Sequence, residues 1–447
     1  MSIFRAYDIR GIYPTELDEK IALKIGKAFG TFNPGKIVVG NDVRLSSPLL
    51  KEQLIKGLIS TGCDVIDIGL VTTPIVIFST RHLECDGGVM VSASHNPKEY
   101  NGFKFFRKYG IPVGYEFGLN EIKKIFESEK FSSGSGTLTT KNVVEDYSNF
   151  LLDNIDVKRP IIIDVVVDAG NGSTGIIYPK ILRRLGIKVH ELFCKPDGNF
   201  PNHLPDPTKK ENLVDLQRKV LEVKANLGFA YDGDGDRLIV VDENGKVVYV
   251  GVIFSVLIEN ALSKNPRSKI VYTALDSKAI HDVIKDQGGI SIVSRVGHTY
   301  VTKKMLEEDA VLAGEISSHY YFKETSCNDA LFASLKVIES LVKTDKKLSD
   351  YTKKFPKYYS QVSEGLRLPV KESEKFPFIE KLKEDFRKKG YRIDTLDGVK
   401  VIFKDGWALF RPSNTEAIIS MSFEATTKKS FEKIKKFVND IIARIPK

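Results

Sequence analysis

The sequence predicts an α/β protein with three similar mixed α/β domains and a smaller C-terminal α+β domain. Three observations support this fold class. A strand–helix–strand pattern occurs three times, each copy leads to a further apolar strand that ends in a polar loop, and the pattern stops near residue 359. Alternating strands and helices of these lengths are typical of parallel α/β sheets.

The first copy begins with KIVVGND (36–42), which reads as a strand followed by a polar turn. Leu50, Leu54 and Leu58 recur at helical spacing in the segment 47–61, and CDVIDIG (63–69) is the next strand. The second and third copies predict strands at 161–170, 187–193, 268–276 and 288–297 and helices at 176–185 and 279–284.

A further apolar strand follows each copy and ends in an unusual loop. These segments are GGVMVSASHNP (87–97), LGFAYDGDGDR (227–237) and AVLAGEISSH (310–319). Ligands of α/β sheets bind at the carboxyl ends of strands, so we expect each domain to present one loop at a functional edge.

The last part of the chain has a different pattern. Short strands are expected in GLRLPV, VKVIFKD, WALFRPS and AIISMSFEA, with a terminal helix from about Lys428. The Lys-rich segment 343–357 is a candidate boundary, although a solvated helix also fits it. The predicted domains cover residues 1–147, 148–247, 248–358 and 359–447.

Composition excludes several classes of protein. The 447 residues carry 67 Lys and Arg against 58 Asp and Glu, a formal charge of +9 that suits an anionic ligand. The sequence has no zinc-finger, RNP or helix-turn-helix signature, so we expect no nucleic acid as a partner. No apolar stretch approaches the roughly 20 residues that span a bilayer, so we expect no membrane partner. The opening MSIFRAYDIRG lacks the apolar core of a signal peptide, and four cysteines without CxxC spacing favour a reducing cytoplasm.

The loop DGDGDR (232–237) is a candidate metal site. Asp232, Asp234 and Asp236 occupy alternate positions, so in an extended loop their side chains point the same way. Three converging carboxylates suit Mg²⁺ or another hard divalent ion, and Gly233 and Gly235 let the backbone curl around it.

A calcium-binding EF-hand loop is an alternative interpretation of the same residues. Asp232, Asp234, Asp236 and Glu243 fall at positions 1, 3, 5 and 12 of such a loop. Arg237 stands where that motif requires glycine, and the flanking segments resemble strands rather than helices. A plain acidic turn is a second alternative, disfavoured because clustered carboxylates repel.

Three other loops carry groups suited to phosphate and sugar chemistry. In SASHNP (92–97), Ser94 could be a nucleophile or phosphate carrier, although these residue types also favour turns. GEISSH (314–319) offers polar groups suited to sugar hydroxyls, and RPSNTE (411–416) combines one fixed cation with short hydrogen-bonding side chains, as a phosphate cradle does. Together with the metal loop, they describe metal-assisted phosphoryl transfer on a phosphosugar.

GNGSTG (170–175) matches the GxGxxG dinucleotide fingerprint, and Glu191 follows about 20 residues later. An NAD-dependent oxidoreductase is therefore a remote alternative. The other two copies of the pattern lack these glycines, and the fingerprint leaves the acidic triplet and SASHNP without a role, which favours a structural turn.

SASHNP, DGDGDR, GEISSH and RPSNTE, in this order, resemble the signature loops of the α-D-phosphohexomutase family. FRAYDIRG (4–11), NGFKFF (101–106), NHLPDPTKKENL (202–213) and VGHTYV (296–301) resemble it as well, so the likeness runs from Phe4 to Glu416. It implies three alike α/β domains and a smaller fourth around a central cleft. It also implies a Mg²⁺-dependent mutase that interconverts hexose 1-phosphate and hexose 6-phosphate through a phosphoserine, with hexose 1,6-bisphosphate as intermediate and activator.

The resemblance assigns a role to each candidate residue. Ser94 would be the phosphoserine and would hold Mg²⁺ together with the three aspartates. Lys104 and His319 would transfer protons, supported by His95 and His298, and Arg10 and Arg237 would stabilise phosphoryl charge. The residues expected to bind substrate are His298, Glu315, Ser317, Arg411, Ser413, Asn414 and Thr415.

Small departures limit the choice of substrate. The phosphomannomutase/phosphoglucomutase branch, which the chain resembles most, typically has Met and Gly where Ile316 and Ser318 stand, and Pro where Ala417 stands. Asn414 disfavours phosphoglucosamine mutase, which stays as the alternative. We therefore expect a cytoplasmic enzyme for mannose and/or glucose phosphates, as a monomer or homodimer.

Overall fold

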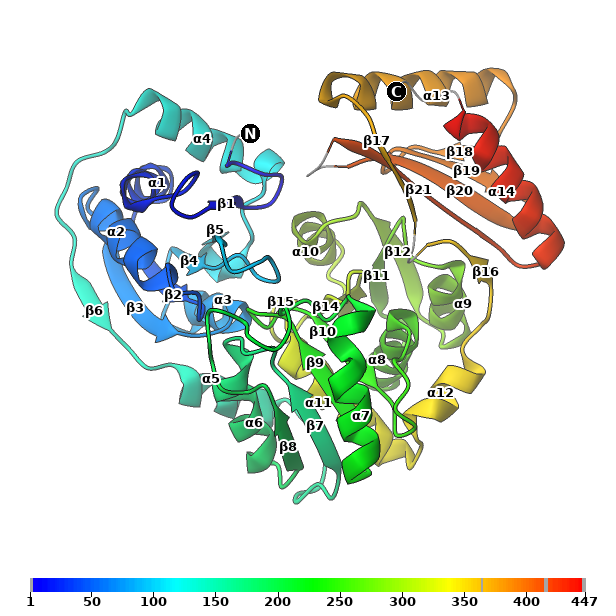
Figure 1. The fold of residues 1–447 in the computed structure, drawn as a ribbon, viewed down its shortest axis with the longest axis horizontal. Coiled ribbons are helices and arrows are strands. Elements are labelled where there is room, and N and C mark those ends of the chain that lie inside the picture. The colour runs from blue at the N-terminus through cyan, green and yellow to red at the C-terminus, as the bar shows by residue number, and fades with distance from the viewer. Residues whose placement is uncertain (1–2, 363–364, 414–416, 444–447) are drawn as a thin grey trace.

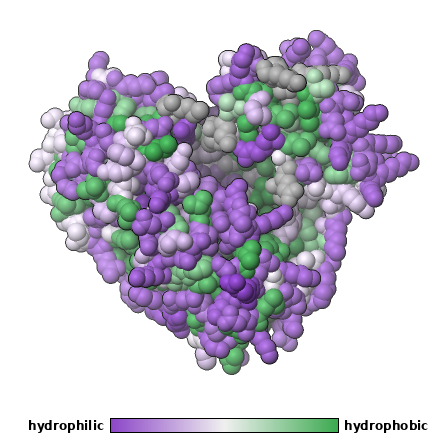
Figure 2. Space-filling view, viewed as in Figure 1, coloured by the Kyte–Doolittle hydropathy of each residue, from purple (hydrophilic) through white to green (hydrophobic). Residues whose placement is uncertain are grey.

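The computed structural model describes residues 3–362, 365–413 and 417–443. Four domains follow one another around the molecule (Figure 1), and the space-filling view is notched between the first and the fourth (Figure 2). This arrangement confirms the predicted fold class.

Domain I contains a six-stranded sheet in the order β1-β5-β4-β2-β3-β6. Its first helix begins at a polar cap: the Asp18 side chain accepts from the Ile21 amide at the start of α1. The elements are β1 (Ile9–Ile12), α1 (Glu19–Phe32), β2 (Lys36–Asn41), α2 (Ser47–Ile59), β3 (Asp64–Leu70), α3 (Thr73–His82), β4 (Gly87–Val91), β5 (Tyr100–Arg107), α4 (Leu119–Ser128) and β6 (Leu138–Thr140).

Domain II has a four-stranded sheet, β10-β9-β7-β8. Its two central strands are buried over almost their whole length, as expected for strands covered on both faces. The elements are α5 (Val144–Asp153), β7 (Asp164–Asp168), α6 (Thr174–Arg184), β8 (Lys188–Leu192), α7 (Val214–Val223), β9 (Leu227–Tyr231) and β10 (Leu238–Val241).

Domain III has a five-stranded sheet, β12-β11-β13-β14-β15. Helix α11 is buried over most of its length, and the Asp329 side chain caps it by accepting from the Phe332 amide. The elements are α8 (Val250–Lys264), β11 (Lys269–Thr273), α9 (Lys278–Asp286), β12 (Ile290–Ser294), α10 (His298–Glu307), β13 (Leu312–Gly314), β14 (Tyr320–Phe322), β15 (Cys327–Asn328), α11 (Ala330–Thr344) and α12 (Leu348–Lys354).

The three sheets share one strand order, which confirms the predicted repeat. The orders are β3-β2-β4-β5, β8-β7-β9-β10 and β12-β11-β13-β14, with the first three strands parallel and the fourth antiparallel. In each domain the third strand of this order leads into the predicted polar loop. The crossover helices α3, α7 and α10, which precede that strand, were not predicted.

Domain IV is a separate sheet, β16-β21-β20-β19-β18 with β17 beside β21, covered by two helices. The predicted strands and terminal helix are present, but α13 was not predicted, because its charged sequence hides a short apolar face. The elements are β16 (Tyr359–Ser360), β17 (Leu366–Pro369), α13 (Glu372–Lys388), β18 (Ile393–Asp394), β19 (Val399–Phe403), β20 (Gly406–Pro412), β21 (Ile418–Ala425) and α14 (Lys428–Ile442).

The first three domains share one hydrophobic core, and domain IV has a separate one. One buried cluster extends from Val38 to Tyr351 and joins domains I, II and III, whereas domain IV has its own core. A small cluster of Val362, Trp407 and Leu409 connects domain IV to domain III. Domain IV is therefore attached through far less apolar contact than the first three domains share.

One of the expected domain boundaries falls inside a helix, and two fall between elements. The limit after residue 147 falls inside α5, whereas those after 247 and 358 fall just before α8 and β16. The Lys-rich segment 343–357 contains α12, as the helical alternative predicted. Among the described residues, all four cysteines are free and buried, and no helix is both long and apolar enough to cross a membrane.

Candidate active site

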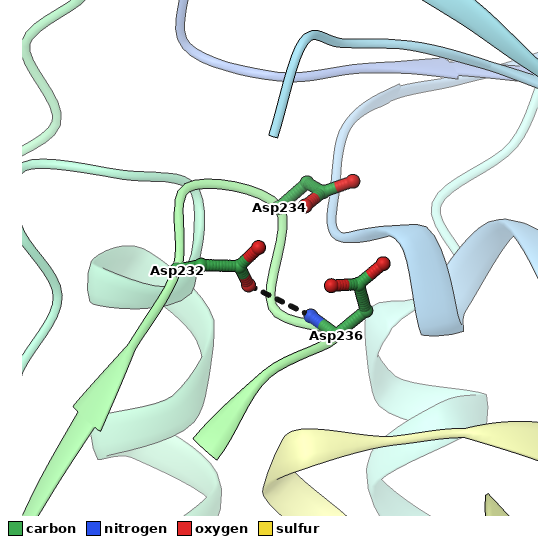
Figure 3. Close-up of side chains that lie close together, drawn as sticks. All are labelled: Asp232, Asp234 and Asp236. Carbon is green, nitrogen blue, oxygen red and sulfur yellow. Dashed lines mark hydrogen bonds between the residues drawn. The ribbon is translucent and has the colours of Figure 1, made fainter. Parts of the chain in front are cut away.

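The acidic loop lies between β9 and β10, which are antiparallel. It is a tight turn rather than the extended loop that was predicted: one carboxylate oxygen of Asp232, Oδ1, accepts from the backbone N–H groups of Gly235, Asp236 and Arg237 at 3.0–3.1 Å. Gly235 has φ +77°, a conformation that glycine tolerates well. The aspartates converge because this turn curls (Figure 3), and strands instead of helices flank it, which excludes the EF-hand alternative.

The three carboxylates form the one cluster of potential metal ligands among the described residues, with ligand atoms within 4.8 Å of one another. All three are buried, and Asp234 Oδ1 has no hydrogen-bond partner in the described structure. Burial, and then the charges of Asp236 and Asp234, raise the pKa of Asp232 well above its ordinary range. This set of hard oxygen donors fits a divalent cation such as Mg²⁺.

Lys104, from β5, reaches across the domain boundary into this cluster. Its Nζ donates to Asp234 Oδ2 at 2.6 Å and to Asp236 Oδ2 at 2.8 Å. Burial lowers the pKa of Lys104, but the three aspartates outweigh burial and raise it. Burial likewise raises the pKa of Asp236, yet Lys104 and His319 hold it well below its ordinary value. One buried ammonium thus offsets part of the negative charge.

Ser94 lies just beyond the end of β4 and is buried against the same cluster. Its Oγ donates to Asp232 Oδ2 at 2.6 Å and lies 3.1 Å from His95 Nδ1. Ser94 has φ +50°, a left-handed conformation that is uncommon for serine and concentrates at functional sites. Burial and the charges of Arg237 and Arg10 hold the pKa of His95 well below its ordinary value.

Arg44 supports the loop that carries Ser94, and the sequence analysis did not single it out. It is buried beneath residues 92–100, the serine loop, and its Nε lies 3.1 Å from Asp42 Oδ2. Its guanidinium donates to four backbone carbonyl oxygens of that loop, those of Ser94, Asn96, Pro97 and Tyr100. The sequence offered one signal for this contact: Asp42 and Arg44 stand as a charged pair directly after the buried strand β2.

The loop after β13 carries Glu315, Ser317 and His319, and the Ser317 hydroxyl contacts the other two side chains. Glu315 accepts from the Tyr321 hydroxyl at 2.6 Å and from Ser317 Oγ at 2.9 Å. His319 Nδ1 lies 2.8 Å from Ser317 Oγ, and its Nε2 lies 3.3 Å from Asp236 Oδ1. Ser318, where the resemblance leads one to expect glycine, adopts φ +72°. His319 reaches the acidic loop despite that replacement.

His298 and the two arginines line the same region. His298 begins α10 with its ring 5.2 Å from that of Tyr7, and burial together with the Lys104 charge lowers its pKa to about 3. Arg237 Nε lies 3.9 Å from Asp232 Oδ2. Arg10 donates to Asn96 Oδ1 at 2.7 Å, so it faces the serine loop.

The predicted phosphate cradle belongs to domain IV. Arg411 lies near the end of β20, with its Nε 3.9 Å from Asp397 Oδ2. Ser413 is buried just after that strand, whereas Asn414 and Thr415 lie outside the described residues. Domains I, II and III therefore form one connected cluster of side chains, and the Arg411 ion pair within the described structure stays inside domain IV.

The glycine-rich loop 170–175 packs against the acidic loop. The Ser173 amide donates to the Gly233 carbonyl at 3.1 Å, and a Cβ on Gly172 would lie 2.9 Å from Gly233 Cα and O. A Cβ on Gly233 would in turn lie 2.6 Å from the Ser94 carbonyl oxygen. Close backbone packing thus explains these glycines without a dinucleotide.

Four domain families match the chain in order. They are described as phosphoglucomutase/phosphomannomutase α/β/α domains I, II and III and the C-terminal domain, and they match residues 1–133, 145–245, 250–359 and 366–441. A phosphomannomutase/phosphoglucomutase of Pseudomonas aeruginosa is 38% identical over 445 residues, covering 97% of this chain and 94% of that protein.

Two further similarities cover nearly whole chains. A phosphomannomutase of Methanocaldococcus jannaschii is 37% identical over 455 residues, with 100% of this chain and 98% of that protein covered. A crystal structure of a phosphoglucomutase/phosphomannomutase family protein from Burkholderia thailandensis aligns with a TM-score of 0.91 at 34% identity, covering 98% and 96% of the two chains.

Proposed function

Because this chain belongs to the phosphoglucomutase/phosphomannomutase family and is therefore a phosphohexomutase, we propose that it interconverts the 1- and 6-phosphates of mannose and/or glucose. The proposed route is a phosphoserine at Ser94 and a hexose 1,6-bisphosphate intermediate, with Mg²⁺ as cofactor. Family membership at this coverage also leaves the NAD-dependent oxidoreductase without support.

The observation that carries the proposal is the contact between Ser94 and the acidic cluster. Ser94 Oγ lies 2.6 Å from Asp232 Oδ2, in a buried cluster that also holds Asp234 and Asp236. A phosphoryl group on this oxygen would lie at the edge of the carboxylate cluster. Mg²⁺ held there by the aspartates and a phosphoserine oxygen would withdraw charge from the phosphoryl group.

The surrounding cations and imidazoles complete this chemistry. Arg237 and Arg10 supply fixed positive charge on the serine side, which stabilises developing phosphoryl charge. Lys104 and His319 are the candidates to move a proton at the sugar oxygen, because both contact Asp236 and therefore lie beside the reacting group. His298, with its pKa near 3, stays neutral at physiological pH and suits hydrogen bonding to substrate.

Recognition of the sugar and of its second phosphate is divided between two domains. Glu315 and Ser317 present an acceptor and a hydroxyl to sugar hydroxyls. Arg411 and Ser413, together with Asn414 and Thr415, would hold the phosphate that is not transferred. A bisphosphate that turns over between these two sites exchanges its reacting end, which is what a mutase requires.

The expected substrates are mannose and glucose phosphates, because the similar proteins are named phosphomannomutase and phosphoglucomutase. Phosphoglucosamine mutase remains the alternative activity. We also keep the cytoplasm as the proposed location, since four free, buried cysteines suit a reducing compartment.

A Ser94→Ala variant tests the proposal in coupled assays with mannose 1-phosphate, glucose 1-phosphate and glucosamine 1-phosphate. We expect loss of nearly all activity, and a phosphoryl group on the Ser94 peptide of the wild-type protein after incubation with glucose 1,6-bisphosphate. Ser79→Ala is a matched control, because Ser79 is equally buried and, among the described residues, its hydroxyl bonds only to its own helix at Ile75. Full activity in Ser94→Ala would refute the phosphoserine route.

A further inference from the structure

Domain IV contacts domain III through charged side chains that bond to backbone groups. Lys400 Nζ donates to the Ala274 carbonyl at 2.8 Å, and Glu424 Oε1 accepts from the Lys278 amide at 2.9 Å. Asp397 Oδ2 accepts from the Val296 amide at 3.0 Å. Because the partners in domain III are main-chain atoms, these bonds fix the position of the domain III backbone itself.

Two of these side chains belong to one connected group around an indole ring. The Lys400 ammonium lies 3.9 Å from the centroid of the Trp407 ring, a cation–π contact. The Trp407 Nε1–H donates to Glu424 Oε1 at 3.3 Å. Burial lowers the pKa of Lys400 to about 8 and raises that of Glu424, as expected for charges enclosed between two domains.

The Trp407 indole lies on the face of strand β20 that also carries Arg411. Side chains alternate along a strand, so Trp407, Leu409 and Arg411 share one face, while Ala408 and Phe410 point into the core of domain IV. Trp407 and Leu409 form the small interdomain cluster with Val362, and Ile316 packs against that cluster.

Ile316 is the residue between Glu315 and Ser317, in the proposed sugar loop. One face of β20 therefore carries the contact with the sugar loop at one end and the phosphate-binding Arg411 at the other. A tilt of β20 about this contact would displace Arg411 relative to the sugar hydroxyl contacts.

We propose that Lys400, Trp407 and Glu424 form a docking unit of positioning residues that sets the register between the phosphate site of domain IV and the sugar loop of domain III. This inference rests on the proposed function of Arg411 and Glu315, and it extends that function to residues that need not touch substrate. The docked arrangement thereby sets the distance between the phosphate site at Arg411 and the sugar site at Glu315. This distance fits a sugar phosphate of one geometry.

The effect on KM depends on how much of the protein has domain IV in the docked arrangement. A protein whose binding-competent arrangement is only partly populated binds with an affinity reduced by that fraction. Loss of one hydrogen bond from a charged group, together with a cation–π contact, shifts the equilibrium between docked and undocked domain IV by at least about tenfold. We therefore expect KM to rise about tenfold while kcat at saturation changes little.

The test compares Lys400→Met with Lys400→Arg and with Lys404→Met. Arg can keep both the positive charge and a donor, and Lys404 is an exposed neighbour in the turn after β19. We expect Lys400→Met to raise KM for glucose 1-phosphate, Lys400→Arg to restore it in large part, and Lys404→Met to behave as wild type. Trp407→Leu is a second variant, which keeps apolar contact but loses the ring and its N–H, and we expect the same split between KM and kcat.

Small-angle X-ray scattering provides a readout that does not depend on catalysis. We expect a larger radius of gyration for Lys400→Met than for wild type without ligand, and convergence of the two at saturating glucose 1-phosphate. Equal scattering together with an unchanged KM would overturn the docking unit, and so would a fall in kcat without a change in KM. If instead the wild-type protein and Ser94→Ala had equal activity, the proposed function would fail while the scattering comparison would still decide whether the unit holds domain IV.

Discussion

Replacement of Lys104 by Met should make the stability of this protein strongly dependent on a divalent cation. Lys104 Nζ lies 2.6 and 2.8 Å from carboxylate oxygens of Asp234 and Asp236, and all three residues are buried. At an effective dielectric constant of about 20, each contact contributes about 6 kcal/mol of attraction before desolvation is subtracted. Removing one member of such a buried set typically costs about 3–5 kcal/mol, because the remaining charges lose their compensation.

The assay is thermal unfolding in EDTA and in a series of Mg²⁺ concentrations. We expect the variant to unfold at a lower temperature than wild type in EDTA and to gain more from Mg²⁺, because its cluster lacks the competing ammonium. A cation at about one hundred times its dissociation constant adds about 2.7 kcal/mol, enough to recover more than half of the loss.

Lys336→Met is the matched control for this experiment. Lys336 is also a buried lysine, but its Nζ bonds to the Asn154 carbonyl and to Glu339, away from the acidic loop. Its loss should destabilise the protein equally in EDTA and in Mg²⁺. The reasoning is refuted if Lys104→Met is as stable as wild type in EDTA, or if its response to Mg²⁺ is no larger than that of wild type.

Two further experiments test other parts of the fold. Gly172→Ala places a Cβ 2.9 Å from the Gly233 backbone, so we expect a stability loss of about 1–3 kcal/mol and a marked fall in mutase activity, measured by thermal unfolding and coupled assay. Ser173→Ala, whose buried hydroxyl has no partner in the described structure, should be near neutral, and equal behaviour of the two variants would contradict this packing. Burial raises the pKa of Asp329 from 3.8 to about 6, so the folded protein binds that proton more tightly than the unfolded chain. Stability should therefore fall by up to about 3 kcal/mol as pH rises from 4 to 6, relative to Asp329→Asn, and parallel pH profiles of unfolding for the two proteins would exclude this effect.

The repeated fold could be predicted because its signals are local. An apolar run, a glycine stop and helical spacing lie within a few residues of one another, and these fix strands such as β2 and β7. The crossover helices α7 and α10 and the charged helix α13 escaped detection, because their apolar faces become distinct only against a neighbouring sheet.

The acidic cluster could also be predicted from a local signal, but the extended loop that was expected is a turn in the structure. Its three aspartates lie within five residues, so any compact loop brings them together. The turn that does so depends on the Asp232 carboxylate accepting three backbone N–H groups and on the left-handed conformation of Gly235. The spacing of apolar and polar residues along the sequence does not indicate such hydrogen bonds.

The sequence by itself determined the classes of element, the four loops and the chemistry that their side chains can perform. Tertiary structure decided which of them meet: Ser94 contacts Asp232 across 138 positions of sequence, Lys104 enters the cluster from another domain, and the guanidinium of Arg44 holds the serine loop from below. It also decided that the fingerprint around Gly172 is a packing surface for Gly233. The physical reason is that spacing along the chain fixes which face a side chain occupies, whereas its partner depends on how separately formed sheets pack against one another.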